Sequence, residues 1–474
     1  MFNTKQLDRP LGWLEALTVD ANLLVVGVCE LEFSSTITGG FDKQRLQSAL
    51  HRCIDCHHSL RMNTTPAKPY HFQYVTQPYS TPSYIEFEGG STDDDDEWQQ
   101  IVNREMNEGF EMGSEVTSLF KLVVLHNQTN PTRQFLLMKY HHSIADGISG
   151  MIILHTLLSF YFDSGDPDNG LTRLADNETL AFPQVTEEVE KQTEQMRTEV
   201  LTYKRQWTPT IPYEVVGNTI RNSALYFNGT QENMDKLMDR CHEEKVTLGS
   251  VLLASTYFAI AELVKEKWLS TPSATFSNFK FDVDVNLRHR YPAAADTPPL
   301  SRYESVGLHV GMMNLNDITV SLQTQFWQLC HVIHQQLTQN LVEGKHLTYL
   351  RANRLCSTDI LMEEQVQRNH GRSSDLNVSN IGKYPFQQEY DDGHIKLKHY
   401  YCAGSGWCPF NGTNVLLVCS MKSLDYTLVY ETGTKNEEIA KHWFQKMTSL
   451  TEAAAETDAE DLTFERWTKD GDAK

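Results

Sequence analysis

The clearest structural signal in the chain is a pair of neighbouring apolar segments, of which the first has the pattern of a strand and the second has the pattern of a helix. Residues 135–140 are aromatic or aliphatic except for one lysine and follow a turn-like segment at 127–131, which predicts a buried strand. After Gly147 the apolar positions have the spacing of a helix with one buried face. They are Ile148, Met151, Ile152, Leu154, Leu158 and Phe162. Residues 141–147 are therefore predicted to form a corner that leads from a strand into a helix.

Further apolar patterns predict an α/β protein in which helices and strands alternate irregularly. Helices are predicted at 98–106, 187–206, 247–264 and 318–341, and strands at 21–29, 279–287 and twice between 414 and 431. A chain of 474 residues is longer than one hydrophobic core usually serves, so we predict two domains of similar size. The predicted parts are an N-terminal lobe at 1–165, a linker with a crossing helix at 166–210, a C-terminal lobe at 211–455 and an acidic tail at 456–474.

Composition and charge narrow the class of protein. The net charge of -21 at pH 7 argues against binding to nucleic acid and to anionic lipid, which both require a basic surface. No stretch approaches the roughly 20 apolar residues of a membrane span, and the N-terminus does not combine a basic region with an apolar core. Nine cysteines without framework spacing suit a reducing compartment. We expect a cytoplasmic protein.

The strand-to-helix corner carries two histidines, an aspartate and a glycine at positions 141, 142, 146 and 147. A neutral imidazole is the best side chain for taking a proton from a hydroxyl, an amine or a thiol near neutral pH. Successive strand residues point to opposite faces, so we assign the base to His142 and a supporting role to His141. We expect Asp146 to bond backbone groups or a distant arginine and thereby hold the loop in shape.

The histidine pair also fits two roles without catalysis. The pair could pack in the core at the end of a strand, or both histidines and Asp146 could belong to an iron or zinc site. Adjacent strand histidines point away from each other, which disfavours a shared ion. We therefore predict that the protein holds no metal.

Residues 141–147 (His-His-Ser-Ile-Ala-Asp-Gly) resemble the His-His-x-x-x-Asp-Gly signature of the coenzyme A-dependent acyltransferase superfamily. This superfamily includes chloramphenicol acetyltransferase, alcohol acetyltransferases, mycobacterial polyketide-associated acyltransferases and the condensation domains of peptide synthetases. Weaker similarities lie at 56–61, 108–124, 283–288 and 378–382, so the resemblance spans nearly the whole chain. It implies an α/β fold with two chloramphenicol-acetyltransferase-like lobes and a tunnel between them.

The resemblance implies a role for each residue of the signature. His142 would remove the proton of the acceptor as that group attacks a thioester carbonyl, and would return it to the departing thiolate. Asp146 and Gly147 complete the candidate catalytic set. Gly147 would leave room for the thioester or its pantetheine arm beside the backbone.

Three residues outside the signature are also assigned by the resemblance. Arg288 would pair with Asp146 across the interface of the lobes and tie the halves together, or it is an ordinary surface arginine. Ser379 and Asn380 would lie near the tunnel, where a polar side chain could stabilise the oxyanion. The alternative for this second segment is a turn that ends a strand.

Three functions follow from these patterns. The first is an O-acyltransferase that moves an acyl group from acyl-CoA, used as a co-substrate, to a small-molecule alcohol without a permanently bound cofactor. The second is a condensation-type N-acyltransferase that uses an amine acceptor or the thioester of an acyl carrier protein. The third is a non-catalytic binding protein on the same fold, although binding alone would need neither His142 nor Asp146.

Overall fold

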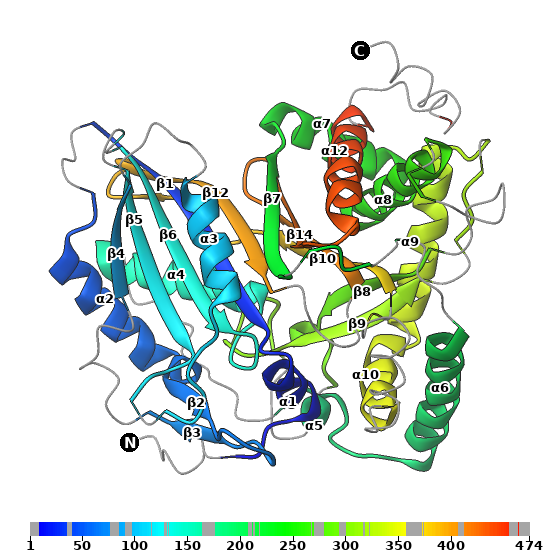
Figure 1. Cartoon of the computed structure of the whole chain (residues 1–474), viewed down its shortest axis with the longest axis horizontal. Helices are drawn as coiled ribbons and strands as arrows, with labels where there is room; N and C mark the ends of the chain where they lie inside the picture. Colours follow the sequence, from blue (N-terminus) through cyan, green and yellow to red (C-terminus); the bar gives the residue numbers. More distant parts are fainter. Residues whose placement is uncertain are drawn as a thin grey trace. The chain divides into compact units, whose positions relative to one another are not determined.

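The chain folds into two α/β units, as predicted, and each unit contains a six-stranded sheet (Figure 1). The computed structural model describes residues 9–35, 40–75, 85–90, 97–114, 116–127, 130, 132–163, 176–206, 211, 214–217, 219–266, 268–269, 279–292, 300–315, 318–321, 323–356, 372, 374–405, 412–454 and 463. The predicted acidic tail, apart from residue 463, lies outside the described residues, as does the start of the predicted linker at residues 166–175.

The two units are not continuous in sequence, which corrects the predicted domain boundaries. The first unit combines residues 1–185 with two later segments, 286–310 and 381–407. The remaining residues form the second unit. Residues 381–407 belong to the first unit because they carry a strand that pairs along the length of the strand at residues 24–33. The chain therefore returns twice to the first unit after leaving it.

The first unit is built on a sheet with the strand order β11-β12-β1-β6-β5-β4. Its strands are β1 (Leu24–Phe33), β4 (Ile85–Gly90), β5 (Phe120–Asn127), β6 (Arg133–His141), β11 (Glu389–Tyr390) and β12 (Ile395–Gly404). Neighbouring strands are antiparallel except for β4 and β5, which are parallel. β6 lies in the interior of this sheet, and its residues from Gln134 to His141 are all buried. This strand is the one predicted from the apolar run.

Helices cover both faces of this sheet. Trp98 of α3 (Glu97–Asn107) stacks on Phe135 of β6, whereas Gly150 of α4 (Gly147–Phe162) lies against Tyr140 of the same strand. Odd and even residues of a strand point to opposite faces, so α3 and α4 lie on opposite sides of β6. α4 also packs against α2 (Lys43–Cys56). The smaller elements are α1 (Trp13–Asp20), η2 (His58–Arg61), β2 (Met62–Thr64), β3 (Phe72–Tyr74) and α5 (Asn177–Ala181).

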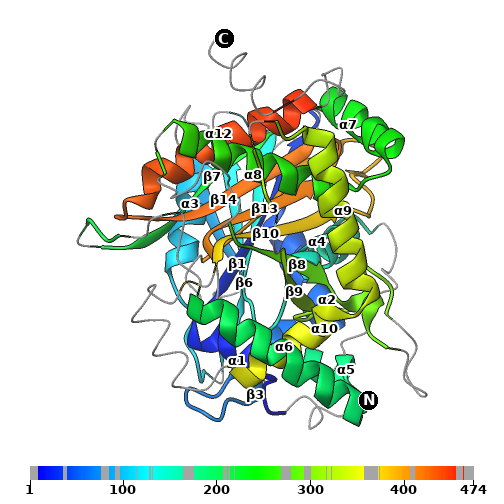
Figure 2. The ribbon, with the colours of Figure 1, turned by 90° about the vertical axis from the view of Figure 1, so that its right-hand side faces the viewer.

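The second unit is built on a sheet with the strand order β7-β14-β13-β10-β8-β9. Its strands are β7 (Arg221–Asn228), β8 (Phe281–Asn286), β9 (Val310–Leu315), β10 (Ser374–Lys383), β13 (Gly412–Ser420) and β14 (Leu424–Thr432). Its helices are α6 (Glu187–Gln206), α7 (Gln231–Glu244), α8 (Leu248–Lys265), α9 (Phe326–Val342), α10 (Lys345–Cys356) and α12 (Asn436–Ala454). α8 packs against α9 and α12, and α6 lies beside α10 (Figure 2).

α8 forms the centre of the hydrophobic core of the second unit. By length and composition it is the one helix in the described part of the chain that could cross a membrane, but 78% of it is buried inside the protein. Val251, Leu252, Tyr257 and Phe258 are fully enclosed by this core. The helix predicted at 247–264 is therefore confirmed as a core helix.

Most other predicted elements are present, with one clear difference. The helix predicted at 318–341 begins only at Phe326. In the preceding residues the backbone N–H of Ser321 donates to Oγ1 of Thr324 at 2.8 Å, which closes a turn before the helix. The apolar residues Ile318 and Val320 are buried but are not helical. Because their spacing matches that of a helix, the predicted helix begins too early in the sequence.

Candidate active site

The predicted corner is present at the end of β6. Leu24 of β1 pairs with His141, and the backbone N–H of His142 donates to the carbonyl of Leu23 at 2.8 Å, so the last strand residues are held on the sheet. α4 then begins at Gly147, with Asp146 as its N-cap. The Asp146 side chain accepts from the backbone N–H of Ser149 at 2.8 Å, which satisfies one of the free donors of the first helical turn. The loop between strand and helix is thus fixed at both ends.

The hydrogen bonds of His142 define which ring nitrogen can accept a proton. Nδ1 of His142 lies 3.0 Å from the carbonyl oxygen of Ala145, and a carbonyl can only accept. Nδ1 must therefore carry the hydrogen, and Nε2 has the free lone pair. Within the described part of the chain, Nε2 has no hydrogen-bond partner, and the side chain is half-buried. His142 is thus held in the tautomer that a general base requires.

The surroundings of His142 keep it neutral. Burial lowers its pKa below the usual 6.5, although the Asp146 charge and the hydrogen bond to Ala145 act in the opposite direction. A neutral imidazole at pH 7 can accept a proton without first losing one. The opposing influence of Asp146 and Ala145 stabilises the imidazolium that would form after proton uptake.

His141 differs from its neighbour in burial and in tautomer. Nδ1 of His141 accepts from the backbone N–H of Ser143 at 3.2 Å and lies 2.8 Å from its hydroxyl, so its hydrogen is on Nε2. The ring is fully buried, and burial lowers the pKa of His141 to about 3, with His142 acting in the same direction. His141 therefore remains neutral, and its ring bonds within the turn that follows β6.

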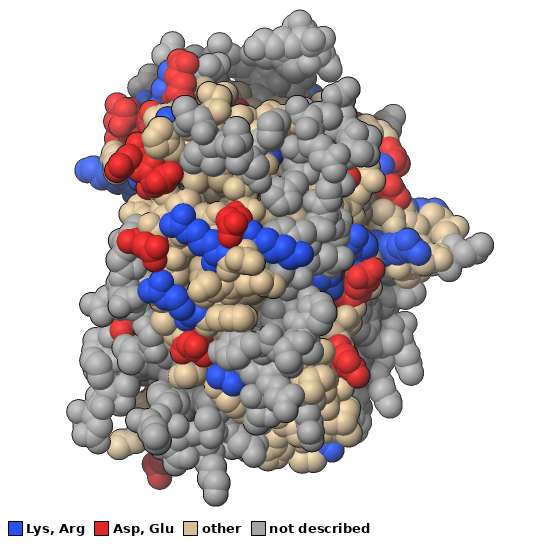
Figure 3. Space-filling model, turned by 90° about the vertical axis from the view of Figure 1, so that its left-hand side faces the viewer, with Lys and Arg blue, Asp and Glu red and all other residues tan. Residues whose placement is uncertain are grey.

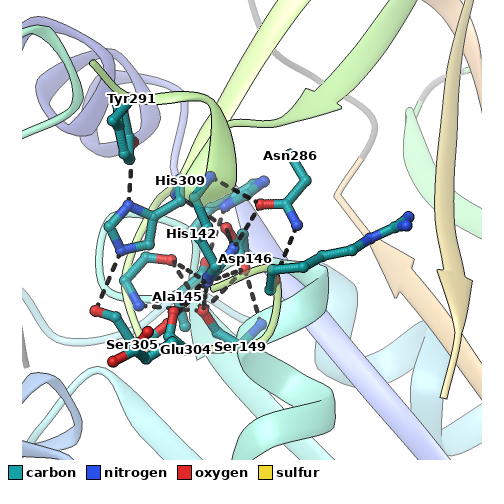
Figure 4. Close-up of polar contacts among 12 residues, drawn as sticks. His142, Ala145, Asp146, Ser149, Asn286, Tyr291, Glu304, Ser305 and His309 are labelled. Atoms are coloured by element: carbon teal, nitrogen blue, oxygen red, sulfur yellow. Dashed lines mark hydrogen bonds and ion pairs between the residues drawn. The ribbon is translucent and has the colours of Figure 1, made fainter. Parts of the chain in front are cut away.

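Asp146 is held by a buried ion pair with Arg288. Figure 4 shows Asp146 close to Ser149 and His309, which also bond its carboxylate. Nη1 of Arg288 donates to Oδ2 of Asp146 at 2.9 Å, and Nη2 donates to Oδ1 at 3.0 Å, which is a bidentate arrangement. Both side chains are almost completely buried. Burial alone would raise the pKa of Asp146, but the charge and hydrogen bonds of Arg288 outweigh it and hold that pKa well below its usual range. The carboxylate is ionised and its oxygens are engaged, so Asp146 is a positioning residue.

The location of this pair corrects one prediction. Asp146 and Arg288 both belong to the first unit, so the pair does not tie two halves together. Arg288 is anchored there by the carbonyls of Glu304 and Ser305, which accept from Nε at 3.0 and 3.1 Å. The alternative of a surface arginine is also wrong, because the Arg288 side chain is fully buried.

Several residues that complete this network were not predicted from the sequence. The hydroxyl of Ser149 donates to Oδ1 of Asp146 at 2.8 Å and lies 2.9 Å from Nη2 of Arg288. The backbone N–H of His309 donates to Oδ2 of Asp146 at 2.9 Å. Asn286 accepts from Nη1 of Arg288 at 3.3 Å. Ser149 could have been found as the third helical residue after an aspartate N-cap, but a backbone donor such as that of His309 leaves no signal in the sequence.

Gly147 is required by close packing in the first unit. A Cβ atom at this position would lie 2.8 Å from Cδ1 of Ile381, which also belongs to the first unit, so the glycine allows the Ile381 side chain to pack closely against the start of α4. The space beside this backbone is thus taken by a side chain of the protein. The approach of a thioester near Gly147 stays a prediction.

Ser379 and Asn380 lie within β10 rather than in a turn that ends a strand. They belong to the second unit, whereas His142 belongs to the first. Ser379 is half-buried and contributes a hydrogen bond to Asp284 of β8, and Nδ2 of Asn377 donates to the same carboxylate at 3.2 Å. Asn380 is exposed. Their assignment to the oxyanion therefore stays a prediction.

Asp284 makes the pH dependence of stability testable. Burial raises its pKa to about 6 from 3.8, despite the hydrogen bonds from Asn377 and Ser379. The folded state thus binds this proton more tightly than the unfolded state. The contribution of Asp284 to the free energy of unfolding is therefore lost as pH rises from about 4 to about 6.

We expect Asp284→Asn to raise the melting temperature at pH 7 and to reduce the difference in melting temperature between pH 4.5 and pH 7. The exposed Asp235→Asn serves as the control, and equal melting temperatures of wild type and Asp284→Asn at pH 7 would contradict this account.

A cavity of about 250 Å³ lies within the second unit. Its lining includes Tyr203 of α6, Asn314 of β9, Asn340 of α9 and Tyr349 of α10. These residues can form hydrogen bonds, but no histidine or cysteine is among the residues that line the cavity. Its ionisable lining residues are Glu199, Lys345 and the two tyrosines, so it contains no imidazole like that of His142. No group of three or more metal-ligating side chains is present among the described residues.

The Condensation domain family matches residues 28–273, which is more than half of the chain. No match to this chain was found among curated proteins. The chain is similar to the trichothecene 15-O-acetyltransferase from Fusarium sporotrichioides, with a TM-score of 0.69, 11% identity, and coverage of 94% of this chain and 95% of the other. It is also similar to the first condensation domain of the CDA synthetase, with a TM-score of 0.65, 14% identity, and coverage of 97% and 98%.

The third similarity is to polyketide synthase associated protein 5 from Mycobacterium tuberculosis, with a TM-score of 0.62, 14% identity, and coverage of 94% of this chain and 98% of the other. These identities are low, so the structural similarities establish the fold. The family match identifies the protein as an acyltransferase. The chain belongs to the condensation-domain family.

Proposed function

We propose that this protein transfers an acyl group from acyl-CoA to a small-molecule alcohol, with His142 as the general base. The observation that carries the proposal is the fixed tautomer of His142. Its Nδ1–H is bonded to the Ala145 carbonyl, so its Nε2 lone pair is free for a proton. The family match supports acyl transfer as the class of reaction.

The reaction requires one proton to move twice. The hydroxyl of the acceptor attacks the thioester carbonyl carbon while its proton passes to Nε2 of His142. The tetrahedral intermediate then loses the thiolate, which receives the proton from Nε2. The C–O bond of the ester forms and the C–S bond of the thioester breaks, so no acyl-enzyme is needed. Ser379 and Asn380, and a tunnel between the lobes, belong to this proposal as the oxyanion site and the substrate path.

The proposal includes acyl-CoA as a co-substrate, no permanently bound cofactor, and a cytosolic location. The cysteines that lie in the described part of the chain are free thiols, which fits a reducing compartment. The donor carries several phosphate groups, whereas the protein has a net charge of -21. Local basic side chains are therefore required to hold the donor.

A condensation reaction with a carrier-bound thioester or an amine acceptor is the second candidate. On one face of the molecule, Lys and Arg side chains gather in a band despite the negative net charge (Figure 3). Such a band would attract the acidic surface of a carrier protein. The third function considered, a binding protein without activity, is disfavoured by the family match and leaves the free Nε2 of His142 without a role.

Thiol release distinguishes these candidates. Purified protein is incubated with acyl-CoAs of graded chain length, alone, with candidate alcohols and with candidate amines. We expect thiol release that depends on an alcohol. Release that depends only on an amine would favour the condensation reaction, and the absence of release with every donor and acceptor would favour the binding protein.

We expect chelation to leave the protein unchanged. Nδ1 of His142 bonds the Ala145 carbonyl and Nδ1 of His141 bonds Ser143, so both rings are already oriented by the protein. A thioester has a good leaving group and does not require a Lewis acid. Dialysis against a strong chelator should therefore alter neither activity nor melting temperature. Loss of activity that one specific metal restores would contradict the general-base mechanism.

A further inference from the structure

A group of basic side chains follows Arg288 in the first unit. Arg290 ends η4 (Arg288–Arg290), and Arg302 lies in the next described segment of the chain. Burial is the largest cause that lowers the pKa of Arg290, and the positive charge of Arg302 is the second. The charges of both arginines also help to lower the pKa of His289. Three basic groups therefore lie close to one another on one part of the first unit.

These arginines have no anionic partner in the described part of the chain. Nε of Arg290 is buried and has no hydrogen-bond acceptor there, and neither Arg290 nor Arg302 forms an ion pair with a described residue. The carboxylate in the same segment, that of Glu304, instead accepts from the backbone N–H of Ser301 at 2.8 Å. Two neighbouring guanidinium groups without a counter-ion repel each other, and a bound anion would remove that repulsion.

The arginine pair is built on the same framework as the base. Nδ2 of Asn286 donates to the carbonyl of Arg302 at 3.1 Å, while Oδ1 of Asn286 accepts from Nη1 of Arg288 at 3.3 Å. Arg288 in turn holds Asp146, four residues after His142. An anion bound by Arg290 and Arg302 would thus be connected to the loop of the base through a short series of hydrogen bonds within one unit.

The two guanidinium groups of Arg290 and Arg302 are better suited to bind a phosphate than a carboxylate. Guanidinium groups bind phosphate through paired N–H donors, and two of them match the charge of a phosphate better than that of a carboxylate. This inference rests on the proposed function, in which the acyl donor is the substrate that carries phosphate. We propose that Arg290 and Arg302 bind a phosphate group of the acyl donor.

The experiment compares three acetyl donors. Acetyl-CoA carries the phosphates of the nucleotide, acetyl-phosphopantetheine carries one phosphate, as does the arm of a carrier protein, and acetyl-pantetheine carries none. Arg302→Gln and Arg290→Gln are measured with each donor, and Arg302 is exposed, so its substitution tests binding without disturbing the core. The exposed Arg221→Gln on β7 of the second unit is the matched control.

We expect each variant to raise KM for the phosphate-bearing donors about tenfold or more, which is the loss expected for a hydrogen-bonded charge pair, with little change in kcat. KM for acetyl-pantetheine should stay at the wild-type value, and Arg221→Gln should behave as wild type with every donor. A rise in KM for acetyl-CoA alone identifies the nucleotide phosphates as the ligand, and an equal rise for acetyl-phosphopantetheine identifies the phosphate of the pantetheine arm. Unchanged KM values for both phosphate-bearing donors, or an equal rise for acetyl-pantetheine, would overturn the inference.

Calorimetric titration with CoA separates this inference from the proposed function. Weaker binding of CoA by Arg302→Gln than by Arg221→Gln supports the phosphate site even if wild type transfers no acyl group, in which case the proposed function alone fails. If wild type is active but both variants keep the wild-type KM and CoA affinity, the phosphate site is overturned and the proposed function is not.

Discussion

His142→Ala is expected to lower the rate of acyl transfer by about 100- to 10,000-fold, which is the range for removal of a general base. The side chain is half-buried at the end of β6, and its loss opens no large cavity in the core, so the fold should persist. Initial rates of thiol release and the far-UV spectrum of the variant test both parts. Turnover within a few-fold of wild type would show that another group takes the proton.

Two observations serve as controls for His142. His331→Ala removes an exposed histidine from α9 that pairs with Glu244, and its activity should equal that of wild type. The activity of wild type should fall at acid pH with a midpoint below 6.5, because burial lowers the pKa of His142. Activity that is lost at a higher pH would point to a different base.

Asp146→Asn is expected to lower the free energy of unfolding by about 3 to 5 kcal/mol, because it leaves the buried Arg288 charge without its partner. Activity should fall together with stability, since the carboxylate fixes the first turn of α4 beside His142. Chemical denaturation at pH 7 provides the measurement. The folded-state pKa of Asp146 is depressed, so the contribution of the pair is present above the unfolded pKa of 3.8 and is lost as pH falls below it.

An exposed ion pair provides the comparison for Asp146. Asp163 lies near Arg45 and Arg52 with a side chain that is 73% exposed, so Asp163→Asn should change stability by less than about 1 kcal/mol. Arg288→Ala should be destabilised to a degree similar to Asp146→Asn. A stable but inactive Asp146→Asn would mean that the carboxylate takes part in the chemistry.

The sequence predicted those parts of the site that depend on local patterns. The change of period near residue 141 marks the end of β6, and Asp146 is a common N-cap residue, so the corner could be placed without a structure. The tautomer of His142 could not be predicted. It depends on the Ala145 carbonyl, which is a backbone group, and every residue has such a group.

Long-range arrangement was less predictable than local structure. β12 pairs with β1, from which it is more than 350 residues distant in sequence, and this pairing brings residues 381–407 into the first unit. The apolar pattern of a strand does not show which strand it pairs with, so the sequence predicts two continuous lobes at 1–165 and 211–455, separated by a linker at 166–210. Arg288 was placed in the wrong unit for the same reason, although its partner was predicted correctly.

Thiol release in the absence of an acceptor is the most direct test of transfer by direct attack. The protein is mixed with acetyl-CoA in molar excess, and free thiol is followed before and after addition of an alcohol that supports turnover. The proposed role of His142 predicts no release before the alcohol and steady release afterwards, with one ester formed per thiol. A burst of one thiol per protein molecule before the alcohol is added, with a stable acetyl group on the protein, would contradict it.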